Sequence, residues 1–181
     1  MLKDYPLNKV FMLIEPGPVL LVTTASGRKK NIMTISWSMP MDFSPNIALL
    51  TGSWNHSFEA LMKTRECVLA VPTADLMKTT VGIGMCSGTD TDKFRKFGLT
   101  AGKAQKVRAP LILECLANIE CRVEDYVEKH GIVVLNAVKA WIDDERKERR
   151  MFHAVGDGRF IVDGRTVNLR KMMEAKLPSG V

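Results

Sequence analysis

Strict alternation of apolar and polar residues from Met33 to Met39 is the feature that most constrains the fold of this chain. In an extended strand, successive side chains point to opposite faces. One face would carry the apolar side chains of Met33, Ile35, Trp37 and Met39. The other would carry the hydroxyl groups of Thr34, Ser36 and Ser38. Small hydroxyls can hydrogen-bond an anion or the edge of a heterocycle without blocking its approach, so the segment predicts both a sheet and a binding surface.

A second polar segment, residues 51–57, follows closely and opens into a predicted helix from Ser57 to Lys63. The start of a helix offers free backbone N–H groups and the positive end of the helix dipole, which favour an anion. The side chains expected to add polar groups there are Thr51, Ser53, Asn55 and Ser57. Ser57 has an alternative role as a plain N-cap that needs no ligand. Because one short strand joins the two polar segments, we expect them to be neighbours and to form a cradle for a phosphorylated ring compound.

Two other residues of this region have both a structural and a functional interpretation. Trp37 can pack against an aromatic ligand or lie in the core as an ordinary buried tryptophan. Asn31 follows a predicted turn over residues 26–30 and can be a turn residue or a ligand contact. The residues alone leave these alternatives open.

Strand patterns dominate the chain, and the helical windows between them are short. Expected strands cover residues 19–25, 33–39, 47–51, 67–71, 116–127, 131–142, 159–162 and 165–169, the last two joined by a turn at residues 163–164. Expected helices cover residues 57–63, 76–81 and 90–97. These helices are too few and too short to connect parallel strands. The pattern predicts a mainly β chain with short helices, folded as a closed antiparallel sheet or barrel.

Composition narrows the classes of function. The 181 residues are 46% hydrophobic and 25% charged, which is ordinary for a globular protein, and we expect a single domain. The net charge of +6 fits an anionic ligand, and its scattered distribution argues against nucleic acid as a partner. Apolar runs such as Pro18 to Val22 are far shorter than the roughly 20 residues of a spanning helix. Since residues 15–18 also interrupt any signal-peptide core, we expect a cytoplasmic protein with no membrane partner.

Motifs for metal binding, nucleotide binding and hydrolysis are absent. The four cysteines form no C-x-x-C pair and are expected to be buried thiols: Cys67, Cys86, Cys115 and Cys121. The histidines lack ligand spacing, so no metal is expected: His56, His130 and His153. The run Gly82–Gly88 imitates G-x-G-x-x-G but breaks it at Ser87 and follows a helical window, so we interpret it as a flexible turn.

Lys93 and His130 are further candidates for the site. Lys93 would lie in the first turn of the predicted helix 90–97, where a cation opposes the helix dipole. This placement suggests pairing with an anion, and an ordinary surface lysine is the alternative. His130 lies in a compact turn, residues 128–130, between two long strands. A histidine there can serve a reaction or be a simple turn residue.

Taken together, these segments resemble the flavin reductase-like, FMN-binding split-barrel proteins, and among them the flavoredoxin-like branch. The resemblance extends from Pro16 to Val138. Its markers are Pro16-Gly17-Pro18, Leu20 with Val22-Thr23-Thr24, Asn31-x-Met33-Thr34-x-Ser36-Trp37, Phe43-Ser44-Pro45, Ser57-Phe58, Asp92-Lys93-Phe94 and the turn histidine His130. No single marker is specific, but their order and spacing together are.

The resemblance implies a homodimer of antiparallel split β-barrels that binds FMN without a covalent bond. The barrel core would span residues 16–142, with a C-terminal extension over residues 143–181. The residues implied to line the isoalloxazine ring and ribityl chain are Asn31, Met33, Thr34, Ile35, Ser36 and Trp37. Those implied to hold the phosphate or its approach are Thr51, Ser53, Asn55 and Ser57.

The resemblance also gives roles to residues outside the two polar segments. It implies that Lys93 reaches the flavin or its phosphate. It implies that His130 lies near the ring or the nicotinamide, as the candidate catalytic residue. Glu128-Lys129 stands before this histidine in place of the family's acidic or glycine-led turn. In the extension, Phe152, His153 and Phe160 are candidate ring contacts.

Three functions follow as alternatives. The first is an NAD(P)H-dependent flavin reductase, in which hydride passes directly between nicotinamide and flavin and no side chain acts as a nucleophile. The second is an electron-transfer flavoprotein that exchanges electrons with a protein redox partner such as a ferredoxin. The third is an anion-binding or nucleic-acid-binding barrel without flavin.

Overall fold

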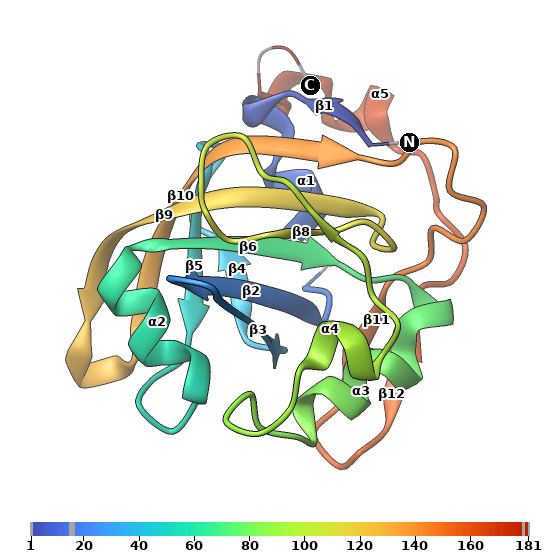
Figure 1. Cartoon of the computed structure of the whole chain (residues 1–181). Helices are drawn as coiled ribbons and strands as arrows, with labels where there is room; N and C mark the ends of the chain where they lie inside the picture. Colours follow the sequence, from blue (N-terminus) through green and yellow to red (C-terminus); the bar gives the residue numbers. More distant parts are fainter. Residues whose placement is uncertain (1, 15–16, 179, 181) are drawn as a thin grey trace.

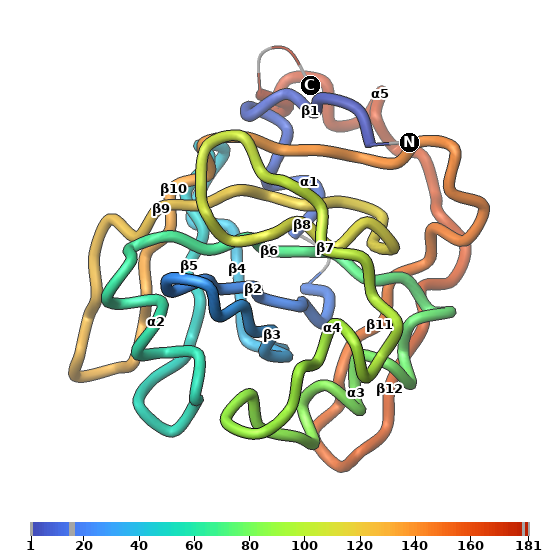
Figure 2. Tube along the Cα trace, viewed as in Figure 1, coloured from blue at the N-terminus to red at the C-terminus, as the bar shows by residue number. Residues whose placement is uncertain are grey.

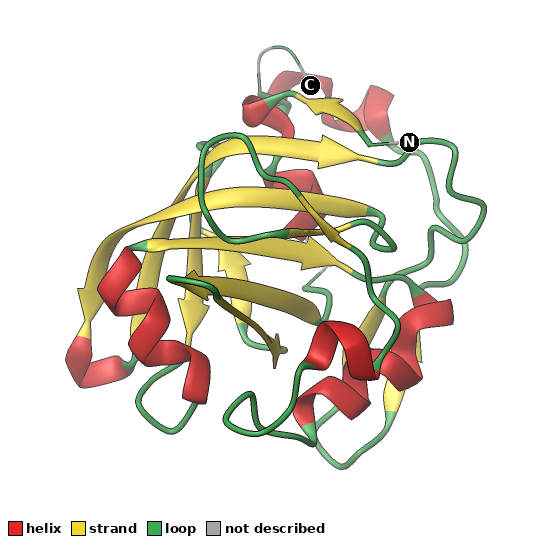
Figure 3. Ribbon diagram, in the orientation of Figure 1, coloured by secondary structure: helices red, strands yellow, loops and turns green. Residues whose placement is uncertain are grey.

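A curled sheet of antiparallel strands forms most of the computed structural model, with short helices along its rim (Figures 1 and 3). The structure describes residues 2–14, 17–178 and 180. Pro16, where the expected core begins, and Val181, where the expected extension ends, lie outside the described residues. Within the described part of the chain, no helix has the length and apolarity required to cross a bilayer.

The strands fall into one large sheet and two small ones. The large sheet contains β1 (Lys3–Tyr5), β2 (Leu20–Ser26), β3 (Lys29–Ile35), β4 (Ser38–Pro40), β5 (Asn46–Leu50), β6 (Glu66–Val71), β9 (Ala117–Val127) and β10 (Ile132–Ile142). The small sheets pair β7 (Ala101–Gly102) with β8 (Leu111–Ile112) and β11 (Phe152–Ala154) with β12 (Phe160–Val162).

The helices are short. The α-helices are α1 (Phe11–Ile14), α2 (His56–Thr64), α3 (Met77–Gly84), α4 (Lys93–Lys96) and α5 (Arg170–Met173). The 3-10 helices are η1 (Leu7–Lys9), η2 (Ala74–Leu76), η3 (Glu128–His130) and η4 (Glu174–Lys176). The predicted class, a mainly β antiparallel split barrel with short helices, is confirmed.

A two-residue link, Ser36–Trp37, explains why the sheet curls. The strand order is β3-β2-β6-β9-β10-β5-β4, so β3 and β4 stand at opposite ends of the sheet although they follow each other in the chain. In a flat sheet, six spacings of about 4.8 Å would separate these end strands by roughly 29 Å. The short link reaches only about 10 Å from Ile35 to Ser38. The sheet therefore curls until its two ends meet at the link, as the trace shows (Figure 2).

The link corrects the prediction of one continuous strand from residue 33 to residue 39. The alternation holds through β3, where Met33 and Ile35 are buried. Beyond the link it fails, because Trp37 is 68% exposed and Met39 is 57% exposed. The Trp37 carbonyl accepts a hydrogen bond from the Leu50 amide at 3.0 Å, which fixes the link against the end of β5.

Two hydrophobic clusters cover the two faces of β2. Leu20 and Val22 point into the main core inside the curled sheet. Leu21 points outward and packs with residues of α3 and α4, such as Ile83 and Phe94. Helices α3 and α4 are thereby fixed against the outer side of β2 and β3, and the segment between them is placed beside the edge strand β3.

Several local predictions are wrong. The expected helix 90–97 reduces to α4, because Asp92 is the N-cap and its carboxylate accepts from the Arg95 amide at 3.1 Å. The expected hairpin around residues 163–164 is replaced by the pair β11–β12, because the buried Phe152 packs edge-on against Phe160. Of the four cysteines expected to be buried, Cys86 is partly exposed.

His153 clamps the β11–β12 hairpin to the loop before β2. Its Nε2 lies 2.7 Å from the Asp163 carboxylate and its Nδ1 lies 3.1 Å from the Gly17 carbonyl oxygen. Partial burial acts to lower the pKa of His153, but the hydrogen bonds to Asp163 and Gly17, with the charge of Asp163, outweigh it and raise the pKa. The clamp is therefore strongest when the imidazole is protonated.

This clamp predicts a pH-dependent stability. A group whose pKa is raised by folding stabilises fully below its unfolded pKa, and that contribution is lost as the pH rises through its folded pKa. The difference in melting temperature between the wild type and Asp163→Asn should therefore be largest below about pH 6.5 and shrink as the pH rises above it. Thermal unfolding followed at a series of pH values measures it. A difference independent of pH would contradict the assignment of the clamp to His153.

Candidate functional site

A pocket lies where the edge strand β3, the start of α2 and the segment after α3 meet. We call it the central pocket, and it has a volume of about 330 Å³. Sites for small molecules usually occupy about 300–1,000 Å³. Its lining comprises Asn31, Met33, Thr34, Trp54, Asn55, His56, Ser57, Gly84, Met85, Cys86, Ser87, Gly88 and Lys93. The two polar segments singled out in the sequence thus face each other across one space.

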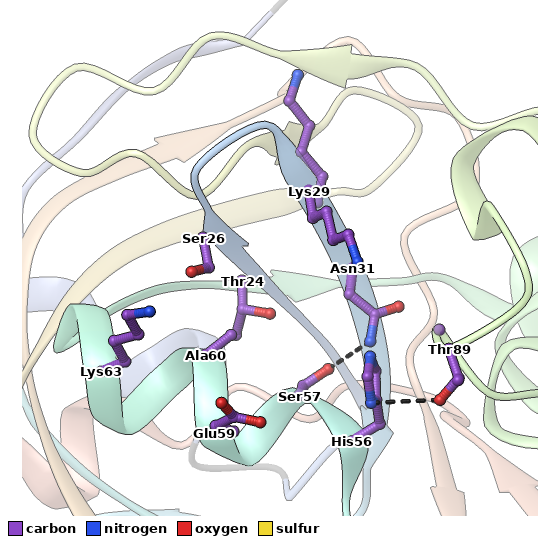
Figure 4. A pocket seen from close by; sticks show the side chains of 12 residues that line it. Thr24, Ser26, Lys29, Asn31, His56, Ser57, Glu59, Ala60, Lys63 and Thr89 are labelled. Carbon is purple, nitrogen blue, oxygen red and sulfur yellow. Dashed lines mark hydrogen bonds between the residues drawn. The ribbon is translucent and has the colours of Figure 1, made fainter.

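Two neighbouring pockets extend the central pocket along β3. The outer pocket, of about 170 Å³, lies at the link and is lined by Thr34, Ile35, Ser36, Trp37, Leu50, Trp54 and Asn55. The hairpin pocket, of about 280 Å³, lies between the β2–β3 hairpin and α2 (Figure 4). Both share lining residues with the central pocket. We call the three together the groove.

Asn31 is held at the middle of the groove. Its Nδ2 donates to Ser57 Oγ at 2.8 Å, which joins β3 to α2 (Figure 4). Its Oδ1 is buried and has no hydrogen-bond partner among the described residues. A Cβ atom on Gly88 would lie only 2.3 Å from Oδ1, so only glycine lets this segment close over the amide. A buried carbonyl oxygen without a partner is costly, and it marks a position where a ligand donor is expected.

The start of α2 has no side-chain cap. The N-cap residue, Asn55, instead directs its Nδ2 to Thr51 Oγ1 at 3.0 Å. Ser57 lies inside the helix and accepts from Asn31, so its alternative role as the N-cap is wrong. Helix starts without caps leave backbone N–H groups free, and these groups attract anions.

Thr51 is a buried residue that holds two lining residues of the groove in place. Its side chain is fully buried and contacts Met33 Sδ at 4.0 Å in addition to Asn55. Its backbone amide donates to the Gly131 carbonyl at 2.9 Å. Thr51 therefore positions Asn55 and Met33 and is not itself part of the lining of the three pockets.

Trp54 forms a wall that the sequence reasoning missed. Its indole lines both the central and the outer pocket and is 68% exposed. A Cβ atom on Gly52 would lie 2.3 Å from this ring, and one on Gly131 would lie 3.2 Å from it. These two glycines make room for the flat indole. With Trp37, which also lines the outer pocket, the groove presents two indole rings to a ligand.

Lys93 lines the central pocket and makes two backbone contacts. Its Nζ donates to the carbonyls of Ile32 at 2.8 Å and Ile83 at 2.9 Å. Burial lowers its pKa, and the nearby Cys86 acts in the opposite direction. Because an ammonium has three N–H donors, one is left for a ligand. Lys93 therefore joins β3 to α3 in addition to lining the pocket.

The remaining candidates are placed less directly. Ser53 and His130 are exposed and lie outside the linings of the three pockets. His130 ends η3, beside Gly131, whose carbonyl accepts from the Thr51 amide and where an added Cβ would meet Trp54. Phe152, His153 and Phe160, expected as ring contacts, belong instead to the β11–β12 hairpin. Among the described residues, no group of three His, Cys, Asp or Glu side chains could hold a metal ion.

Two other parts of the groove were not identified from the sequence. The turn after α3, interpreted only as flexible, supplies Met85 to Gly88 as one wall, next to Gly84 at the end of α3. His56 lines the central and hairpin pockets, and its Nδ1 lies 3.4 Å from Thr89 Oγ1. In the sequence, only position pointed to these two parts of the groove. His56 precedes the candidate Ser57, and the turn precedes the candidate Lys93.

Comparison with known proteins identifies the family of this chain. The family model described as "Flavin reductase like domain" matches residues 12–159. An uncharacterized protein from Archaeoglobus fulgidus is 39% identical over 121 residues, which are 66% of this chain and 68% of that protein.

Solved structures share the fold. An FMN-binding domain of a flavin reductases-like enzyme from Shewanella baltica aligns with a TM-score of 0.86 and 20% identity, over 93% of this chain and 97% of that chain. Flavoredoxin of Desulfovibrio vulgaris aligns with a TM-score of 0.75 and 21% identity, over 84% of this chain and 89% of that chain.

The contact between Gly88 and Asn31 predicts a coupled pair of substitutions. Gly88→Ala should lower the free energy of unfolding by about 1–3 kcal/mol, because the new methyl group overlaps the Asn31 amide. In an Asn31→Ala background the overlap is removed, and Gly88→Ala should cost less than about 0.5 kcal/mol. Urea unfolding of the wild type, Gly88→Ala, Asn31→Ala and the double variant measures the loss of unfolding free energy in both backgrounds. Equal costs in the two backgrounds would show that Asn31 is not held against Gly88.

Proposed function

The chain belongs to the flavin reductase-like family, and we propose that it is an FMN-binding oxidoreductase that accepts hydride from NADH or NADPH. The observation that carries this proposal is the groove itself, where two indole rings adjoin the unpartnered Asn31 Oδ1 and the uncapped start of α2. A flat heterocycle, a polar chain and a phosphate are the three chemistries that such a lining suits. We further propose that the whole chain works as one FMN-binding domain.

The groove residues divide according to the part of FMN that they suit. Trp37 and Trp54 would flank the isoalloxazine ring, beside Met33, Thr34, Ile35 and Ser36 of the strand edge. The Asn31 carbonyl would accept from a ribityl hydroxyl. The start of α2, with Ser57, would hold the phosphate, and the free donor of Lys93 would add positive charge.

Hydride transfer between a nicotinamide and a flavin needs no nucleophilic side chain. Bound FMN would supply the hydride acceptor. The residues of the chain would bind and orient the ring, exclude water from one of its faces and hold the phosphate. We propose that His130 and Ser53 act at the edge of the site, His130 toward the nicotinamide and Ser53 on the approach of the phosphate. The closeness of Gly131 to Trp54, whose ring an added Cβ would meet at 3.2 Å, supports this position for the turn that carries His130.

Electron exchange with a protein partner is the second candidate function. It is favoured by the shallow outer pocket, where Trp37 is 68% exposed, because a flavin bound there would lie near the surface. A redox protein could then approach it directly. The free thiols of all four cysteines support the further proposal that the protein works in the reducing cytoplasm.

We also propose that two copies associate through an apolar patch next to the link. The patch consists of Trp37, Met39, Met41 and Phe43, each about half exposed or more. A pocket of about 270 Å³ lies among Trp37, Met39 and residues of β5 and β10. Contiguous exposed apolar surface of this kind usually marks an interface.

Stopped-flow spectroscopy separates the two functions. Mixing the FMN-loaded protein with NADH or NADPH should bleach the flavin absorbance within seconds, because hydride transfer needs no other protein. Asn31→Ala should weaken FMN by about 1–3 kcal/mol through loss of its contact with the ribityl chain. An unbleached flavin that is readily reduced by a low-potential ferredoxin would assign the electron-carrier function instead.

The apolar patch gives a prediction about assembly. Met39→Lys should raise the dimer dissociation constant at least about tenfold, because it buries an unpaired charge at the interface. Met172→Lys is the matched control, since Met172 is 83% exposed on α5 and outside the patch. Sedimentation equilibrium measures both variants. If Met39→Lys leaves the association unchanged, the dimer uses another surface.

A further inference from the structure

Two segments of the chain carry positive charge and no negative charge. Residues 16–41 contain no aspartate or glutamate, and neither do residues 93–113. At the β2–β3 turn and in the loop that precedes β8, these segments contribute six exposed cations: Arg28, Lys29, Lys30, Lys103, Lys106 and Arg108. The net charge of the whole chain is +6, so these two short stretches hold as many cations as the chain has in excess.

The fold brings the two stretches together. Residues 101–112, which we call the strap, contain β7, β8 and the loop between them, and they pack over β6 and β9 (Figure 1). Thr23 of β2 donates to the Pro110 carbonyl at 2.6 Å, which ties the strap to the hairpin. A pocket of about 360 Å³ between them, the strap pocket, includes Lys30, Lys103 and Arg108 in its lining. We call the six cations around this pocket the basic surface.

The sheet beneath the strap holds it in place. Glu120 of β9 is fully buried, and its carboxylate accepts from the backbone amides of Gln105, Lys106 and Val107 at 2.5 to 3.2 Å. It also accepts from Trp141 Nε1 at 2.8 Å. Because backbone N–H groups and an indole occupy this carboxylate, it forms no ion pair with the lysine side chains of the strap. The cations therefore stand on a fixed frame.

One of the six cations is paired within the protein. Arg108 Nε lies 3.1 Å from a Glu66 carboxylate oxygen, to which the Arg108 amide also donates at 3.0 Å. The other five cations form no ion pair with any residue that the structure describes. Like charges gathered in this way repel one another, and a partner of opposite charge relieves that repulsion.

We propose that the basic surface docks an acidic protein and that this protein is the redox partner of the second candidate function. The proposal rests on the proposed flavin site. Lys30 lines both the strap pocket and the hairpin pocket, so the basic surface is continuous with the groove. A 100-residue protein has a radius of gyration of about 13 Å. A partner of that size centred at Lys30 therefore also covers the hairpin end of the groove.

An acidic protein fits this surface better than a nucleic acid does. Proteins that bind single-stranded nucleic acids stack the bases on aromatic side chains. Residues 17–36 and 98–113 contain no Phe, Tyr, Trp or His, so this surface offers charge without a stacking platform. Lysine ammonium groups act as point charges that suit carboxylate side chains, and complementary charges of this kind speed the encounter of two proteins.

Charge neutralisation on the strap tests the docking surface. Lys103→Gln/Lys106→Gln removes two cations that lie outside the groove, and the control Lys171→Gln/Lys176→Gln removes the same charge from α5 and η4. The probe is an acidic ferredoxin, with a basic cytochrome as the probe of opposite charge. Calorimetry at low salt without flavin should show ferredoxin binding weakened at least about fivefold in the strap variant and less than about twofold in the control, with no binding of the cytochrome.

The FMN-loaded protein separates docking from the flavin proposal. Reduction by subsaturating reduced ferredoxin should slow at least about fivefold in the strap variant, while any bleaching by NADH stays at the wild-type rate. If ferredoxin does not bind the wild type, or binds the strap variant as well as the control, the docking surface is wrong and the flavin site stands.

Two further outcomes are decisive. If a single-stranded oligonucleotide binds the wild type more tightly than ferredoxin does and is lost in the strap variant, the partner is a nucleic acid and the inference is wrong. If ferredoxin docks on the strap while the protein binds no flavin, the flavin proposal is wrong and the docking surface stands.

Discussion

The shortness of the Ser36–Trp37 link is the constraint on which the rest of the structure depends. It joins strands at opposite ends of the sheet order, so the sheet must curl until its ends meet. The meeting point leaves β3 as an edge strand, and its polar side chains face the start of α2 instead of another strand. The groove therefore follows from chain connectivity, and the hydrophobic core inside the curl holds it in place.

Contacts within the protein itself hold the polar groups of the groove in place. The hydrogen bond from Asn31 to Ser57 and the one from Asn55 to Thr51 fix its polar groups, while Gly88 closes over one side. Two of the four buried side-chain oxygens that lack partners among the described residues belong to the groove, Asn31 Oδ1 and Thr24 Oγ1. Unpaired buried polar atoms cost stability, and a preorganised site recovers that cost on binding. This combination supports the proposal that the groove binds a ligand.

Sequence reasoning identified the fold class and the two polar segments because both depend on local alternation and on turn residues. It failed where contacts between residues far apart in the chain determine the local structure. The strand break at Ser36–Trp37 depends on sheet closure, and the hairpin of Phe152 and Phe160 depends on burial in the core. Trp54 was missed because the space for its ring comes partly from Gly131, far away in the chain. The carbonyl contacts of Lys93 likewise join three elements that no local pattern connects.

A crystal structure of the protein grown with saturating FMN tests the central claim most directly. The account predicts electron density for the ring between Trp37 and Trp54, with the phosphate at the start of α2 beside Ser57. FMN bound elsewhere on the molecule, or a groove that stays empty at saturating FMN, would contradict it.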